Sequence, residues 1–162
     1  MVAWFLMNLS FMTPLPPPPI THQITGDLSD GHRILIVDDE QAVLFAYRKL
    51  IEKDGMTVDI SADFEDAIRH IRTRRYLAVI ADLRLAGTDN GDGLEILRII
   101  QNEQPDTKTI LATGYGDSEI EKTARALGVS YYFNKPVSPS DILGALREFQ
   151  SSRFSASVAA AP

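Results

Sequence analysis

The stretch "ILIVDDE", residues 34–40, places four aliphatic residues directly before three acidic ones. A short apolar run bounded by polar residues is typical of a strand that is buried on both faces of a parallel sheet. Four further runs of this kind follow: "TVDIS" (57–61), "LAVIA" (77–81), "TILAT" (109–113) and "YYFN" (131–134). The sequence therefore predicts five β-strands.

Apolar residues return at helical spacing after each predicted strand, near residues 43–51, 67–71, 94–100, 120–127 and 142–149. Strands that alternate with helices form a parallel sheet with helices packed against its faces. Gly55 and Gly128 fit C-terminal helix caps, and Ser138 before Pro139 fits the start of a helix. The expected fold class is α/β, a doubly wound sheet of five parallel strands with five helices.

One domain accounts for most of the 162 residues. We expect a disordered or loosely ordered Pro-rich extension over residues 1–31, a domain over residues 32–150 and a flexible tail over residues 151–162. The extension begins with "MVAWFLMNLSFM", which is apolar but too short to cross a bilayer as a helix. We therefore expect no membrane insertion.

Charge and composition exclude several classes of function. The formal net charge is −6, and no run of Lys or Arg exceeds the pair Arg74 and Arg75, so we expect no nucleic-acid binding by this chain. The absence of cysteine excludes disulfides, thiolate metal sites and cysteine nucleophiles. Because there is also no basic targeting segment at the start, we expect a cytoplasmic protein.

Polar residues occupy the carboxyl ends of the predicted strands, where ligands bind in open parallel sheets. Asp38 and Asp39 end the first strand, Asp82 the third and Thr113 the fourth, and Lys135 follows the fifth. Taken singly, each is commonly a turn former, a helix cap or a solvated charge. Together they bring three carboxylates, a hydroxyl and an ammonium group to one edge of the sheet.

Three clustered carboxylates require a cation. Two carboxylates about 5 Å apart repel each other by roughly 3 kcal/mol at an effective dielectric constant of about 20. One lysine offsets only part of this charge, and an all-oxygen site without His or Cys favours Mg²⁺, which keeps several of its waters. These residues therefore indicate a magnesium site beside a carboxylate.

Three other interpretations fit less well. A calcium loop in "TDNGDGLEILRI" (88–99) would place Thr88 and Ile99 where a carboxylate and a bidentate Glu are needed. A phosphate-binding loop would have to hold its anion against the acidic "DDEQAV" (38–43). A phosphatase with an aspartyl nucleophile usually carries a second acid two residues later, and that position is Arg84.

With "ILIVDDE", the strand ending in Asp82, "ILATGYG" (110–116) and "YYFNKP" (131–136) in this order and spacing, the chain resembles the receiver domains of two-component response regulators. The resemblance covers about residues 33–150. It implies the flavodoxin-like fold with strand order 2-1-3-4-5. It also implies a single-domain signalling protein, similar to the chemotaxis regulator, that catalyses its own phosphorylation and dephosphorylation but is not a dedicated enzyme.

The resemblance implies a role for each site residue. Asp82 matches the phosphoacceptor, which takes a phosphoryl group from a sensor histidine kinase or a histidine phosphotransfer protein. Asp38, Asp39, Asp82 and the backbone carbonyl of Arg84 match the ligands of Mg²⁺. Lys135 is similar to the lysine that pairs with a phosphoryl oxygen.

A switch is implied as well. Thr113 matches the hydroxyl that binds another phosphoryl oxygen, and Tyr132 the aromatic residue that turns inward when that hydroxyl moves. The change would alter contacts with a downstream protein, or within a homodimer, on the face formed by the fourth helix, the fifth strand and the fifth helix. The alternative is a protein-binding module with a receiver fold that does not depend on phosphorylation.

The segment after Asp82 departs from the family pattern. Ala86 stands where a proline is usual, and the loop that leads to "GLEIL" is longer than is common. It contains Gly87, Gly91 and Gly93. We therefore expect an unusually mobile loop beside the phosphorylation site.

Overall fold

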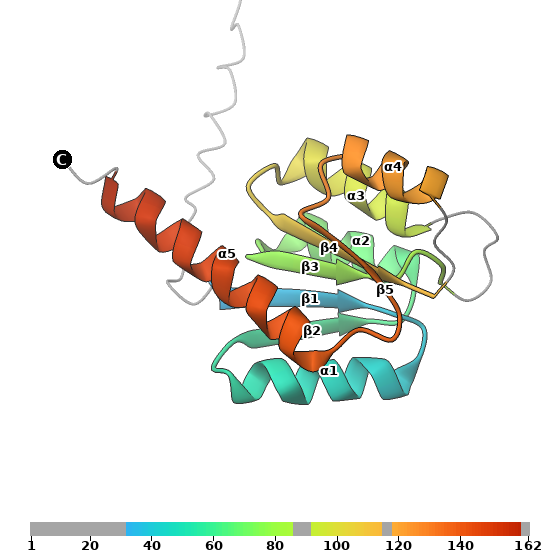
Figure 1. Ribbon diagram of the computed structural model, residues 1–162, viewed down its shortest axis with the longest axis horizontal. Coiled ribbons are helices and arrows are strands. Elements are labelled where there is room, and N and C mark those ends of the chain that lie inside the picture. Colours follow the sequence, from blue (N-terminus) through green and yellow to red (C-terminus); the bar gives the residue numbers. More distant parts are fainter. Residues whose placement is uncertain (1–31, 86–91, 115–117, 160–162) are drawn as a thin grey trace, which may run out of the picture.

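The computed structural model describes residues 32–85, 92–114 and 118–159. The predicted extension over residues 1–31 lies outside these ranges, as do Ala86, Gly87 and Gly91. Strands and helices alternate along the described residues (Figure 1). They are β1 Arg33–Val37, α1 Gln41–Lys53, β2 Thr57–Ser61, α2 Phe64–Thr73, β3 Ala78–Ala81, α3 Asp92–Glu103, β4 Lys108–Thr113, α4 Ser118–Ala126, β5 Tyr131–Asn134 and α5 Pro139–Ala159. The five predicted strands are confirmed to within one residue at each end.

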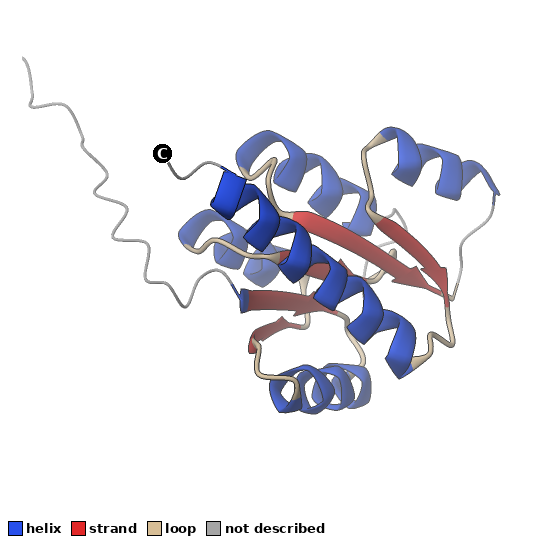
Figure 2. Cartoon of the chain, turned by 60° about the vertical axis from the view of Figure 1, so that its left-hand side comes forward, coloured by secondary structure: helices blue, strands red, loops and turns tan. Residues whose placement is uncertain are grey.

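The strands form one parallel sheet in the order β2-β1-β3-β4-β5. Helices cover both of its sides (Figure 2). Buried residues of α1 and α5 pack on one face, and those of α2, α3 and α4 pack on the other. This confirms the doubly wound, flavodoxin-like fold and its expected strand order.

The apolar run of β1 contributes to both faces of the sheet. Ile34 and Ile36 belong to the core cluster under α1 and α5, whereas Leu35 and Val37 belong to the cluster under α2, α3 and α4. Successive side chains of a strand point to opposite faces, so a central strand with a core on each side needs an apolar residue at every position. This explains why "ILIV" does not alternate with polar residues.

Local signals at the helix ends behave as predicted. Gly55 and Gly128 adopt φ values of +86° and +77°, the left-handed region in which glycine avoids a Cβ clash. The Ser138 hydroxyl accepts a hydrogen bond from the Ser140 amide at 3.3 Å. It therefore caps the start of α5, in which Pro139 is the first residue.

The end of α5 differs from the prediction. The sequence predicts a flexible tail from residue 151, but α5 continues to Ala159 and extends beyond the sheet (Figure 1). The hydroxyls of Ser151, Ser152 and Ser155 donate to backbone carbonyls four residues earlier, at 2.9, 2.9 and 3.0 Å. Adding a residue to an existing helix needs no new nucleation, so α5 can continue once its buried turns have formed.

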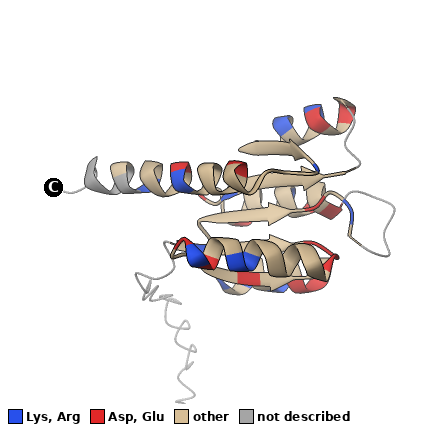
Figure 3. Ribbon diagram, turned by 60° about the horizontal axis from the view of Figure 1, so that its bottom comes forward, with Lys and Arg blue, Asp and Glu red and all other residues tan. Residues whose placement is uncertain are grey.

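Charges of both signs share the helices, and Lys and Arg lie beside Asp and Glu on α1, α4 and α5 (Figure 3). Many of them pair within one helix, as Arg125 does with Glu121 at 2.7 Å.

Among the described residues, no helix combines the length and the apolar character needed to cross a membrane.

A polar cluster ties β2 to β1 and to the segment after α2. The Asp59 side chain, 14% exposed, accepts a hydrogen bond from the Tyr76 hydroxyl at 2.9 Å and lies 2.8 Å from Arg74 Nη1 and 3.3 Å from Arg33 Nη1. Burial alone would raise the pKa of Asp59, but the Tyr76 hydrogen bond and the two arginines hold it below its ordinary value. Ionised Asp59 therefore stabilises the folded state.

Replacing Tyr76 by Phe tests this cluster. Tyr76→Phe should lower the free energy of unfolding at neutral pH by about 1.5 to 3 kcal/mol, because it removes a hydrogen bond to a charged group. Since the folded-state pKa of Asp59 lies below the unfolded value of about 3.9, its stabilisation is present above that pH and is lost as the pH falls towards the folded-state pKa. The loss should therefore shrink in acid, as urea unfolding at several pH values would measure.

Tyr131→Phe is the matched control, because the Tyr131 hydroxyl donates to Glu148 at an exposed position. Exposed hydrogen bonds of this kind contribute little. Equal destabilisation by the two variants would contradict the importance of the Asp59 cluster.

Candidate functional site

The carboxyl ends of β1 and β3 lie side by side at the centre of the sheet. Val37 pairs with Ala81, and the next residue of each strand is an aspartate. The Asp82 amide donates to the Val37 carbonyl at 2.9 Å, and the Asp38 amide donates to the Ser61 carbonyl at 3.1 Å. These hydrogen bonds continue the ladder past the strands, so the backbone fixes the place of both aspartates.

Three of the predicted residues form one acidic cluster. Asp38, Asp39 and Asp82 each offer a carboxylate oxygen within 4.8 Å of the others. Asp38 is 3% exposed and Asp82 8%, whereas Asp39 is half-buried. The loss of water around the first two carboxylates makes their charge costly unless a cation or a donor is near.

Lys135 lies between two of these acids. Its ammonium donates to Asp38 Oδ2 at 2.7 Å and to Asp82 Oδ2 at 2.9 Å. Burial alone would lower the pKa of Lys135, but the hydrogen bonds to Asp38 and Asp82 raise it above its ordinary value. The lysine is therefore charged over the physiological pH range and links the end of β5 to the ends of β1 and β3.

The lysine does not neutralise the cluster. Burial raises the pKa of Asp38, and the hydrogen bonds from Lys135 and from the Glu40 amide, the latter 2.9 Å long, offset this only in part. Asp82 Oδ1 is buried and has no hydrogen-bond partner among the described residues. An orphaned carboxylate oxygen beside two other acids fits a hard divalent cation such as Mg²⁺.

The remaining predicted residues lie around this cluster. Thr113 ends β4 with no exposed surface, and its carbonyl accepts the Lys135 amide at 2.9 Å. Tyr132 is half-buried in β5, opposite Leu111, and packs against the core under α2, α3 and α4. Arg84 lies two residues after Asp82, with its side chain exposed, and its role as a carbonyl ligand stays a prediction.

Two contributions to the site were not predicted. The Glu40 amide donates to Asp38 Oδ1, as in turns where an aspartate bonds the backbone two residues later, and the position of Asp38 at a strand end is compatible with such a turn. Tyr47 appeared in the sequence only as an apolar position of a helix. Burial raises its pKa, while Lys135 lowers it and Asp38 raises it, so the phenol lies within electrostatic range of the site.

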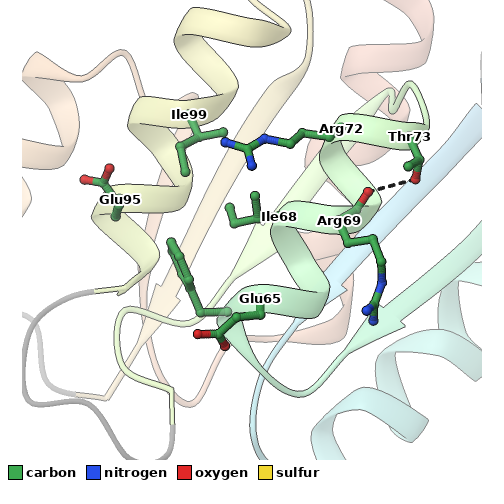
Figure 4. Close-up of a pocket in the computed structure, with 8 residues that line it drawn as sticks. Glu65, Ile68, Arg69, Arg72, Thr73, Glu95 and Ile99 are labelled. Atoms are coloured by element: carbon green, nitrogen blue, oxygen red, sulfur yellow. Dashed lines mark hydrogen bonds between the residues drawn. The ribbon is translucent and has the colours of Figure 1, made fainter.

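A separate groove between α2 and α3 has a volume of about 730 Å³. Its walls combine apolar side chains with paired charges, and its lining residues are Phe64, Glu65, Ile68, Arg69, Arg72, Thr73, Glu95 and Ile99 (Figure 4). None of these belongs to the acidic cluster. The groove is therefore separate from the acidic cluster at the strand ends.

Known proteins are similar to this chain over the same residues. The family model of the response regulator receiver domain matches residues 34–147. The acid tolerance regulatory protein ActR of Sinorhizobium medicae is 36% identical over 131 residues, which cover 80% of this chain and 66% of ActR. The chain therefore spans slightly less than two thirds of the length of that relative.

Solved structures agree in fold. A CheY-like response regulator receiver domain protein from Methanospirillum hungatei has a TM-score of 0.70 at 29% identity, covering 76% of this chain and 96% of that one. The BeF3-activated receiver domain of DrrB has a TM-score of 0.65 at 25% identity, covering 74% and 97% respectively.

The cluster predicts opposite effects of one substitution with and without Mg²⁺. Asp39→Asn should raise the free energy of unfolding by about 1 kcal/mol in chelator, because it removes repulsion from a half-exposed carboxylate that solvent partly screens. Wild-type protein should gain stability as Mg²⁺ is added, and the variant should gain far less. Thermal unfolding with chelator and with millimolar Mg²⁺ measures both.

Asp106→Asn serves as the control, since Asp106 is exposed and lies outside the cluster. It should keep the wild-type response to Mg²⁺. The same response in Asp39→Asn would argue against a cation at these three carboxylates.

Proposed function

This chain belongs to the response regulator receiver domain family of two-component systems, and on that premise we propose that Asp82 accepts a phosphoryl group from a histidine of a sensor kinase or a phosphotransfer protein. The family is a signalling module and not a dedicated enzyme. One observation carries the proposal: Lys135 holds Oδ2 of Asp82 while Oδ1, buried, has no hydrogen-bond partner among the described residues. One oxygen is thus oriented by the lysine, and the other is not engaged by any described residue.

The transfer needs little covalent help from the protein. An oxygen of Asp82 forms a bond to phosphorus while the bond between phosphorus and the donor's histidine nitrogen breaks, and its electron pair goes to the imidazole. Negative charge on the phosphoryl oxygens must be balanced at the same time. Lys135, already 2.9 Å from Asp82, supplies one positive charge at that place.

Magnesium fits the remaining charge. Asp38, Asp39 and Asp82, with the carbonyl of Arg84, would hold the ion, and the bound ion would neutralise oxygens of the incoming phosphoryl group. The Glu40 amide and the Lys135 ammonium keep Asp38 oriented. Hydrolysis of the resulting acyl phosphate would use the same residues, so that phosphorylation and dephosphorylation are both reactions of this domain.

Signal output would pass through β4 and β5. Thr113 is buried at the end of β4, and its carbonyl binds the backbone amide of the lysine that contacts Asp82. We propose that its hydroxyl binds a phosphoryl oxygen and that Tyr132 moves with it, which would change the face formed by α4, β5 and α5. A downstream protein or a second copy of the chain would contact that face.

The setting is part of the same proposal. We propose a cytoplasmic location, because a donor kinase would act there, and the absence of cysteine supports a reducing compartment. Because ActR is longer than the matched region, the activity of a whole regulator is not carried over to this chain.

Phosphorylation can be tested with a small phosphodonor. Wild-type protein incubated with acetyl phosphate and Mg²⁺ should gain the mass of one phosphoryl group, and hydroxylamine should remove it because it cleaves acyl phosphates. Asp82→Asn should gain none, whereas Asp106→Asn should react as the wild type does. Intact-protein mass spectrometry measures all three, and uptake by Asp82→Asn would refute the assignment of the phosphoacceptor.

The proposed switch separates uptake from output. Thr113→Val keeps the shape of a fully buried side chain and removes its hydroxyl, so the protein should still take up a phosphoryl group. The chemical-shift changes that beryllium fluoride produces on α4, β5 and α5 should be largely lost in this variant. Wild-type changes on these elements in Thr113→Val would show that the hydroxyl does not transmit the signal.

A binding module that does not need phosphorylation is the remaining alternative. Under this alternative, the protein would bind its partner with the same affinity in the presence and in the absence of beryllium fluoride. The intact set of three carboxylates and one lysine argues against it, because burying these charges without use costs stability.

A further inference from the structure

The first turn of α3 packs against the backbone of Asp82 and Leu83. The Gly93 amide donates to the Leu83 carbonyl at 3.1 Å, and Gly93 is buried. A Cβ atom added at Gly93 would lie 2.3 Å from the Asp82 carbonyl oxygen and 2.8 Å from the Leu83 Cα. Only a residue without a side chain allows α3 to approach the strand end this closely.

We propose that Gly93 is a positioning residue of the phosphorylation site. Its contact with the peptide between Asp82 and Leu83 sets the place of the Asp82 carboxylate and of the following Arg84 carbonyl. This inference rests on the proposed function and deepens it, because these two groups are the proposed nucleophile and a proposed ligand of Mg²⁺.

Neither side of the contact can move away easily. Ala81, directly before Asp82, is bound in the middle of the sheet, opposite Val37 on one side and Leu111 on the other. Leu83, directly after it, is 1% exposed in the core. Protein interiors are close-packed, so an added methyl group here must displace backbone.

Helix α3 is also anchored in the core. Ile96, Leu97 and Ile100 of α3 are each no more than 2% exposed and pack in the same core cluster. A shift forced by a Cβ at Gly93 would therefore be shared between α3 and the segment that follows Asp82. A displacement of about 1 Å at reacting groups can reduce a rate about 100-fold.

The structure corrects the reading of this glycine in the sequence. The sequence predicts a mobile loop that includes Gly93 with Gly87 and Gly91, but Gly93 is a buried residue of α3. Its φ is not positive, so the requirement for glycine comes from the space beside Asp82 and not from the backbone conformation.

Gly93→Ala tests the proposal, with Gly144→Ala as the matched control. Gly144 is also a helical glycine, on α5, and a Cβ there would meet nothing within 4 Å. Mg²⁺ affinity is measured by isothermal titration calorimetry, and the rate of phosphoryl uptake by mass spectrometry with acetyl phosphate. Amide resonances of Asp82, Leu83 and Arg84 report their positions.

We expect Gly93→Ala to weaken Mg²⁺ binding by about 10-fold or more, to slow phosphoryl uptake by at least as much, and to shift the amides of residues 82–84. Gly144→Ala should keep wild-type binding and uptake and should be slightly more heat-stable. If the role of Gly93 were purely structural, Gly93→Ala would lower the melting temperature and leave Mg²⁺ affinity and phosphoryl uptake unchanged. Wild-type Mg²⁺ affinity in Gly93→Ala, with shifts confined to α3, would overturn the proposal.

Two precautions keep the test decisive. If Gly93→Ala is partly unfolded, the same titrations in sucrose, which favours the folded state, report on the folded molecules. If wild-type protein takes up no phosphoryl group, the proposed function fails, but Mg²⁺ affinity and the amide shifts of residues 82–84 still decide the role of Gly93. Should the wild type bind no Mg²⁺ either, unshifted amides in Gly93→Ala would overturn the proposal and shifted amides would support it.

Discussion

The ammonium of Lys135, held between Asp38 and Asp82 at 2.7 and 2.9 Å, is the interaction on which the site depends. Two nearly buried carboxylates would repel each other strongly without it. Because Lys135 comes from the end of β5 and the aspartates from β1 and β3, the contact also joins three strands of the sheet. It offsets one negative charge of three, and the charge that remains suits a divalent cation.

The winding of the sheet makes this arrangement available. The order β2-β1-β3 places two strands that are distant in sequence next to each other at the centre, where the winding reverses. Asp38 and Asp82 each follow directly on a pair of matched residues, Val37 and Ala81. The charges are thus fixed by a buried part of the sheet, which orients them before any ligand arrives.

The two borders of the site differ in character. On the side of α3, Gly93 packs against the backbone of Asp82 within a buried core of leucines and isoleucines. On the side of β5, Tyr132 is half-buried in a strand at the edge of the sheet. In our proposals, the first border positions the nucleophile and the second changes when a phosphoryl group is bound.

Much of this molecule could be predicted from its sequence. The five strands followed from short apolar runs, since a strand with a core on both faces cannot alternate with polar residues, as "ILIV" in β1 illustrates. The residues near the site followed from their position at strand ends, because parallel strands deliver these ends to one edge. The extent of α5 did not follow, because the small and polar residues after residue 150 are also typical of a flexible segment.

Distances between segments were decided only by the tertiary structure. Three features of the site depend on packing between elements that are far apart in the chain. Lys135 donates to both Asp38 and Asp82, and Oδ1 of Asp82 has no hydrogen-bond partner among the described residues. The charges of Lys135 and Asp38 also shift the pKa of Tyr47. Gly93 is the clearest case. In the sequence it is one glycine of a polar loop, and only the approach of α3 to β3 reveals that a side chain has no space there. Sequence patterns indicate which residues are buried and where the chain turns. A close contact between the backbones of a helix and a strand is marked in the sequence only by the glycine itself.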